Sequence, residues 1–136
     1  MDLSLLILKV RNNLSDIPLS YIDDSAILND LRRADDFVEL IKRPEADEDK
    51  IKTGVEFLAS YYSYMTWTTL AEKELGQIPY STIQKANHLR SMARSYLQLI
   101  SKFPLTEDLT VDLAKIDTKV PAFKLSGSIV EYDQRW

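Results

Sequence analysis

The sequence predicts an all-α protein: an antiparallel bundle of about four helices, followed by an extended, partly β-prone C-terminal arm. Three observations support this fold class. Apolar residues recur at helical spacing throughout residues 1–103. The 136-residue chain has only 3 glycines and 5 prolines, which favours long regular elements. The helical period is lost in the last third of the chain, so we divide it into a bundle (1–103) and an arm (104–136).

The first helix is expected from about residue 3 to residue 14, with Asp2 as its N-cap and an end before Pro18. Leu5 and Leu8 widen its apolar stripe beyond a single face. This width predicts contacts on two sides of the helix, one of them with another subunit.

The second helix is expected at about residues 25–42. Asp23 or Asp24 supplies its N-cap, and Pro44 follows its end. Apolar residues that step by four and three form a narrow stripe along it: Ile27, Leu31, Ala34, Val38 and Ile41.

The third helix is long, at about residues 48–75. Gly76 suits the residue just after its C-terminus, and Pro79 prevents continuation. Four large aromatic residues fall within seven positions: Tyr61, Tyr62, Tyr64 and Trp67. They cannot all point into one core, so we expect part of this cluster, with Tyr61, Tyr64 and Trp67 as candidates, at a subunit interface.

The fourth helix is expected at about residues 82–102, where Ser81 and Gln84 form a capping-box pattern. Residues 105–113 have room for one short helical turn capped by Thr106. From Ile116 onward, alternating apolar residues and a Ser-Gly-Ser turn indicate strands that need a partner.

Composition and motifs argue against an enzyme. The chain has no cysteine, and so no thiol nucleophile or thiolate metal site. Phosphate-binding loops and hydrolase or metalloprotease motifs do not occur. We therefore expect no catalytic residues, no cofactor and no metal, and no stretch approaches the length of a membrane span.

Several polar residues are candidates for a site. Asp35, Asp36 and Glu39 are spaced to bind a hard cation, but a solvated helix face explains them better. An enzyme using these carboxylates is the weakest of three functional hypotheses. The acids at 47–49 favour a helix N-terminus, and His88, the only histidine, has no acidic partner in its helix.

Charge is distributed unevenly along the chain. The net charge is −4, which disfavours general nucleic-acid affinity. The fourth helix, however, carries bases and no acid. Lys85, Arg90 and Arg94 are therefore candidates for a face toward DNA or toward an acidic partner, beside the simpler interpretation of a solvated face.

Residues Leu6–Arg43 combine a short helix, a loop and an acid-capped second helix. The pattern is carried by Val10, Arg11, Leu14, Asp16, Tyr21, Asp23, Asp24, Ile27, Leu28, Leu31 and Ala34. This stretch resembles the start of the head–tail connector (adaptor, or head-completion) proteins of tailed bacteriophages and related viruses. The order of helices and C-terminal extension matches that family over the whole chain.

The resemblance implies a structural protein of the virion, made in the host cytoplasm. Such adaptors form a ring, typically twelvefold, between the portal and the stopper or tail-completion proteins, and help to retain packaged DNA, which passes through the channel. The arm would bind the portal by adding strands to it. Its expected anchors are Phe123, Leu125, Ile129, Val130, Tyr132 and Trp136.

Two alternatives stay open. The arm is also able to fold back on its own bundle. The chain is also compatible with a small helical DNA-binding or packaging-regulatory module, in which the first two helices act as a helix-turn-helix. The acids of the second helix, including Asp30 and Asp36, disfavour contact with a phosphate backbone.

Overall fold

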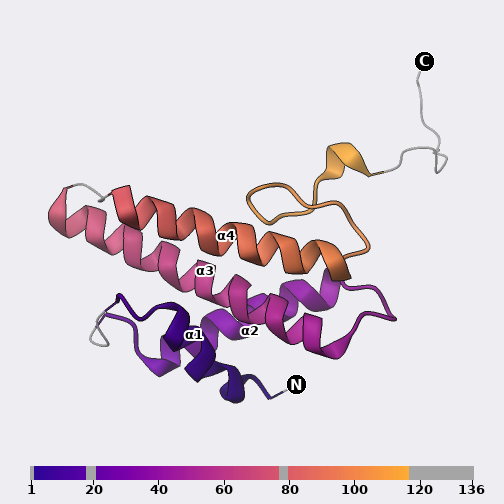
Figure 1. The fold of residues 1–136 in the computed structure, drawn as a ribbon, viewed down its shortest axis with the longest axis horizontal. Coiled ribbons are helices and arrows are strands. Elements are labelled where there is room, and N and C mark those ends of the chain that lie inside the picture. Colours follow the sequence, from indigo (N-terminus) through magenta and orange to yellow (C-terminus); the bar gives the residue numbers. More distant parts are fainter. Residues whose placement is uncertain (1, 18–20, 77–79, 117–136) are drawn as a thin grey trace.

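The computed structural model describes residues 2–17, 21–76 and 80–116, and these ranges form a helical bundle (Figure 1). The described ranges contain no β-strand, which confirms the all-α prediction. In chain order the elements are the 3₁₀ helix η1 (Leu3–Leu6), α1 (Ile7–Asn13), α2 (Asp24–Ile41), α3 (Glu48–Leu75), α4 (Tyr80–Ile100) and the 3₁₀ helix η2 (Leu113–Lys115).

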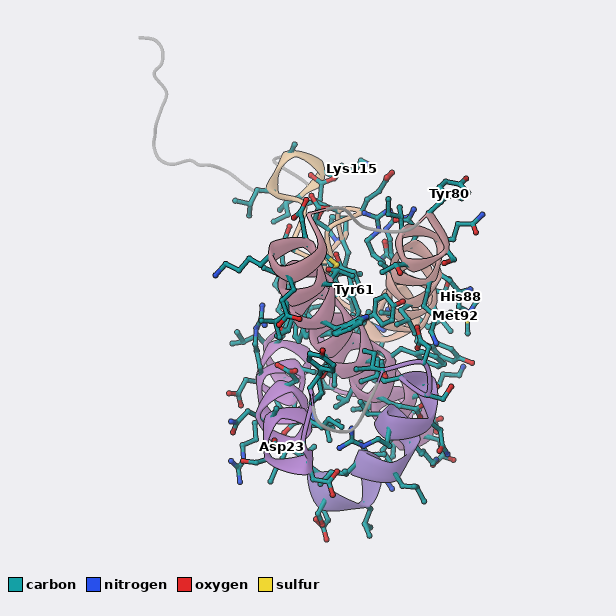
Figure 2. The ribbon with its side chains drawn as sticks, turned by 90° about the vertical axis from the view of Figure 1, so that its left-hand side faces the viewer. Asp23, Tyr61, Tyr80, His88, Met92 and Lys115 are labelled. Carbon is teal, nitrogen blue, oxygen red and sulfur yellow. The ribbon has the colours of Figure 1, made fainter. Side chains whose placement is uncertain are left out.

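Helix α3 is the central element. Helix α4 lies along one side of it, and α1 and α2 lie on the other (Figures 1 and 2). A helix covered on two sides buries more than one stripe of its surface. Accordingly, small residues such as Ala59, Ser60 and Ser63 are buried beside larger ones such as Val55 and Leu58.

The helix ends follow the sequence-based expectations in most cases. The carboxylates of Asp23 and Asp47 accept hydrogen bonds from the backbone N–H groups of Ala26 (2.8 Å) and Lys50 (3.3 Å). Gly76 ends α3 in the left-handed region at φ 79°. The capping box predicted at Ser81 is wrong, because the helix already includes Tyr80 and Ser81 lies inside it.

The loop after α4 belongs to the packed unit. Leu105 and Leu109 are 1% and 2% exposed and are members of the hydrophobic core. Backbone hydrogen bonds close the loop, from Thr106 N–H to the Thr110 carbonyl and from Asp112 N–H to the Pro104 carbonyl, both 2.8 Å. The core therefore continues past the boundary predicted after residue 103, and residues 104–111 pack against the bundle.

Leu109 has a backbone conformation that the sequence did not predict. Its φ of 64° is left-handed, a region that costs a non-glycine residue about 1 kcal/mol. Burial of its side chain offsets that cost. The short helical turn of this segment lies later than expected, at η2, where Asp112 rather than Thr106 is the N-cap.

Candidate interaction surface

The aromatic cluster of α3 is covered mainly by the chain itself. Tyr64 is 1% exposed, so the prediction that it lies at a subunit interface is wrong. Half-buried Trp67 packs on Tyr21 with ring centroids 4.8 Å apart. Half-buried Tyr62 lies under the Arg33 guanidinium, 3.8 Å from the ring centroid. The prediction assumed that α3 has a single buried face. In the structure α3 lies between α4 and the α1–α2 pair, so aromatic residues on several of its faces are covered.

Tyr64 belongs to a polar contact that joins three segments. Its hydroxyl donates to Asp16 at 3.0 Å, and the Lys85 ammonium contacts the same carboxylate at 2.9 Å. Burial raises the pKa of Asp16, but the hydrogen bonds from Lys85 and Tyr64 outweigh burial and lower it. Burial and then the Asp16 carboxylate raise the pKa of Tyr64 to about 12. The contact ties α4 and the end of α1 to α3.

Stability should fall at high pH because of Tyr64. The unfolded phenol ionises near 10.0 and the folded one near 12, so the unfolded state gains stability as pH rises through this window. At pH 11, midway through this window, we expect a loss of about 1 kcal/mol, which the Tyr64→Phe variant should lack. Urea titrations at pH 7, 9, 10 and 11 would measure it, and identical slopes for both proteins would contradict the assignment.

A second contact missed from the sequence joins α2 to α3. The buried Ser63 hydroxyl donates to the Asp30 carboxylate at 2.6 Å. Burial is the main cause that raises the pKa of Asp30. Asp30 and Ser63 are 33 residues apart in the sequence, and Asp16 and Tyr64 are 48 residues apart. Neither pair could be predicted from a local sequence pattern.

Replacing Asp30 with asparagine should stabilise the protein at neutral pH. The amide oxygen still accepts the Ser63 hydrogen bond, and the partly desolvated charge is removed. Because burial raises the folded pKa of Asp30, the difference should vanish as pH falls through 3.8, where the carboxyl is protonated in both states. A variant less stable than wild type at pH 7 would show that the ionised carboxylate stabilises the fold.

The three predicted basic candidates all have partners within the chain. Lys85 pairs with Asp16, as described. Arg90 lies 3.8 Å from the Asp108 carboxylate, whose side chain is 84% exposed. Arg94 donates one N–H to the carbonyl of Leu105 at 3.2 Å. Each charge is thus partly satisfied within the subunit.

The surface between α3 and α4 contains two adjoining hollows, which we call the α3–α4 groove. The first, about 180 Å³, is mostly apolar and is lined by Tyr61, Met65, Thr68, Ile83, Ala86, Asn87 and Arg90. The second, about 220 Å³, is polar and is lined by Asn87, Arg90, Ser91, Arg94 and Glu107. Tyr61 lies on the α4-facing side of α3 (Figure 2) and lines the first hollow. It is the one of the three predicted interface aromatics that borders the groove.

The opposite side of the bundle exposes large apolar side chains. Leu5 and Leu8 are 74% and 68% exposed, and Leu40 on α2 is 72% exposed. Leu6 and Val10 of the same N-terminal segment are buried in the core. The segment therefore has one apolar face in the core and a second at the surface. The contact of the second face with another subunit stays a prediction.

The remaining candidates stay separate from these hollows. Asp36 and Glu39 are exposed on α2 beside half-buried Asp35, and burial followed by the charge of Glu39 raises the pKa of Asp35. His88 is exposed on α4 (Figure 2). No metal-binding group of three or more such side chains occurs in residues 2–17, 21–76 and 80–116. The predicted arm anchors, Phe123 to Trp136, lie outside the described residues.

Comparison with known proteins identified no relative. No protein-family model, no curated protein and no solved structure matches this chain. In the part of the chain that the structure describes, no helix combines the length and apolar character that a membrane crossing requires.

Proposed function

We propose that the protein is a structural adaptor of a viral head–tail connector, which forms a ring between the portal and the tail-side proteins. The observation that carries the proposal is the exposed leucine pair, Leu5 and Leu8, on a segment whose other face is already in the core. The resemblance of residues 6–43 to connector adaptors supplies the biological setting.

The leucine pair favours association over a solitary bundle. Burying an exposed leucine contributes about 1.5–3 kcal/mol, so two adjacent ones are an effective centre for an interface. Scattered apolar residues are normal on a surface, but two neighbours on one helical turn form a patch. In a ring, each subunit contributes this patch once, and many weak contacts then act together.

The charge of α2 disfavours the alternative, a small DNA-binding or packaging-regulatory module. As the second helix of a helix-turn-helix, α2 would approach a phosphate backbone, but it carries the acids Asp30, Asp36 and Glu39. On α4, Lys85 is already paired with Asp16 at 2.9 Å. Under the proposal, packaged DNA is instead a non-specific neighbour inside the channel.

The proposal gives the C-terminal arm a separate partner. Phe123, Leu125, Ile129, Val130, Tyr132 and Trp136 remain the proposed portal anchors, chosen from the sequence. The stopper or tail-completion protein would bind the other side of the ring. No catalytic step is part of this function.

Mass measurement of the purified chain, alone and with a portal ring, tests the proposal. We expect wild-type protein to form rings at high concentration or on the portal. Leu8→Asp should weaken this association at least tenfold, because it places a charge in the apolar contact. Leu113→Asp is the matched control, since Leu113 is 75% exposed on η2, outside the leucine patch.

Two results would overturn the proposal. One is a chain that stays monomeric at all concentrations, ignores the portal and binds DNA in a salt-sensitive manner. The other is equal loss of association in Leu8→Asp and Leu113→Asp, which would assign the effect to added charge rather than to the leucine patch.

A further inference from the structure

We infer that the α3–α4 groove of one copy receives the outer face of α2 from the next copy of the same chain. This contact rests on the proposed ring and deepens it, because it names the two surfaces that meet. We define the α2 face by Asp36, Glu39 and Leu40, which are all exposed.

The groove is suited to a ligand that is apolar at one end and acidic at the other. Its first hollow is bordered by Met65 and Ile83, which are 40% and 44% exposed. Its second hollow is bordered by two bases, Arg90 and Arg94, and by one acid, Glu107. Asn87 and Arg90 line both hollows, so the two are continuous along α4.

The arginine end retains unused capacity for an acceptor. The Nε of Arg94 is buried and has no hydrogen-bond partner among the described residues. An unpaired buried donor is costly, so this arginine is incompletely satisfied by its own chain. Arg94 also borders the second hollow, where a carboxylate can approach it. Arg90 is 3.8 Å from the highly exposed Asp108, and such a surface pair is weak enough for a second carboxylate to displace.

The α2 face matches this pattern. Leu40 and Asp36 are four residues apart in one helix, so they project from the same side about 6 Å apart along the axis. Glu39 adds a second carboxylate beside them, which is paired with Lys42 of the same chain at 2.6 Å. An exposed helix that places an apolar anchor in a groove is a common mode of recognition, and the acids complement Arg90 and Arg94.

The two surfaces are separate within one chain. The C-terminal ends of α2 and α4 meet through the backbone at Lys42 and Ser101, but α2 and the start of α4 lie on different sides of α3 (Figure 1). Each copy therefore has one groove and one α2 face. A contact between unlike surfaces repeats from copy to copy and closes into a ring if the rotation allows. The leucine patch is a separate surface of the same copy, since Leu8 lines a hollow with Asp24 at the start of α2.

Cross-linking tests the contact directly, because the chain has no cysteine. A Leu40→Cys protein mixed with an Ile83→Cys protein and a short bismaleimide should give a cross-linked heterodimer. The same reaction with Leu113→Cys in place of Leu40→Cys is the control, since Leu113 is equally exposed. We expect at least tenfold faster coupling for the 40–83 pair. Equal rates, or coupling mainly between two copies of one variant, would overturn the inference.

Exchange of charged residues tests the same contact in protein that has not been cross-linked. Arg90→Glu and Asp36→Arg should each weaken self-association at least tenfold, and the double variant should regain most of it. Lys73→Glu and Glu74→Arg are matched controls, because they make the same charge changes at exposed positions near the end of α3. Loss in the double variant as severe as in both single variants would overturn the inference.

The outcomes separate this inference from the proposed function. Rings that are broken by Leu8→Asp, yet unaffected by Arg90→Glu and Asp36→Arg, would refute the α2 contact and leave the adaptor proposal standing. Self-association that requires Arg90 and Asp36, in a protein that never joins a portal, would refute the adaptor and support the contact. Binding of an acidic peptide in the groove, without self-association, would refute the second copy as its occupant.

Discussion

Removing residues 104–136 should destabilise the helical bundle by roughly 4 kcal/mol or more, because two buried leucines leave the core. Leu105 and Leu109 are almost fully buried, and Arg94 donates to the Leu105 carbonyl. The deletion would expose the apolar surface that they cover. Urea unfolding monitored by circular dichroism at 222 nm would measure the change.

The shorter deletion of residues 117–136 is the matched control. We expect it to leave the free energy of unfolding within about 0.5 kcal/mol of wild type, since every core member among the described residues is retained. This shorter chain should also lose binding to the portal, because it lacks the proposed anchors. Equal destabilisation by both deletions would show that residues 117–136 are part of the core, contrary to the division proposed from the sequence.

Leu97→Ala should destabilise the protein by about 3 kcal/mol, the usual range for a leucine lost from a close-packed core. Leu97 is 0% exposed and packs against Gly54, where an added methyl group would lie 3.1 Å from the Leu97 Cδ2 atom. The two helices therefore approach each other closely at this glycine. Thermal and urea unfolding would both report the loss, and a change below about 1 kcal/mol would mean that the core collapses around the cavity.

Gly54→Ala provides the partner for a double-mutant cycle. Alone, it should be close to neutral, because about 1 kcal/mol of helix propensity is offset by crowding against Leu97. In the Leu97→Ala background the crowding is gone, and the same substitution should stabilise by about 1 kcal/mol. Additive effects in the two backgrounds would show that Gly54 and Leu97 do not share the space between the helices.

Much of the fold followed from local patterns. The stripe from Ile27 to Ile41 on α2 and the Asp23 cap were predictable, because helical period and capping depend on residues only a few positions apart. The start of α4 was predicted too late because only the local pattern was considered. Ser81 and Gln84 match a capping box, but the helix already begins at Tyr80. The left-handed Leu109 had no local signal, since leucine disfavours that conformation and tertiary burial supports it.

The candidate surface was predicted less completely. Leu5 and Leu8 were found because the apolar stripe was too wide for one contact, and both are exposed. Tyr64 was wrongly assigned to a subunit interface, because the local sequence does not show how many helices surround α3. The α3–α4 groove could not be predicted, since its lining comes from residues more than 20 positions apart, such as Met65 and Arg90.

The sequence by itself determined the helical class, the approximate helix ends and the residues that form each apolar stripe. These features depend on interactions within one or two turns, which a single segment contains. Only the tertiary structure decided that α3 is central, that residues 104–111 pack on the bundle and that Arg90 and Arg94 border one groove. Those outcomes depend on how several helices share one limited volume, and contacts between distant segments set that arrangement.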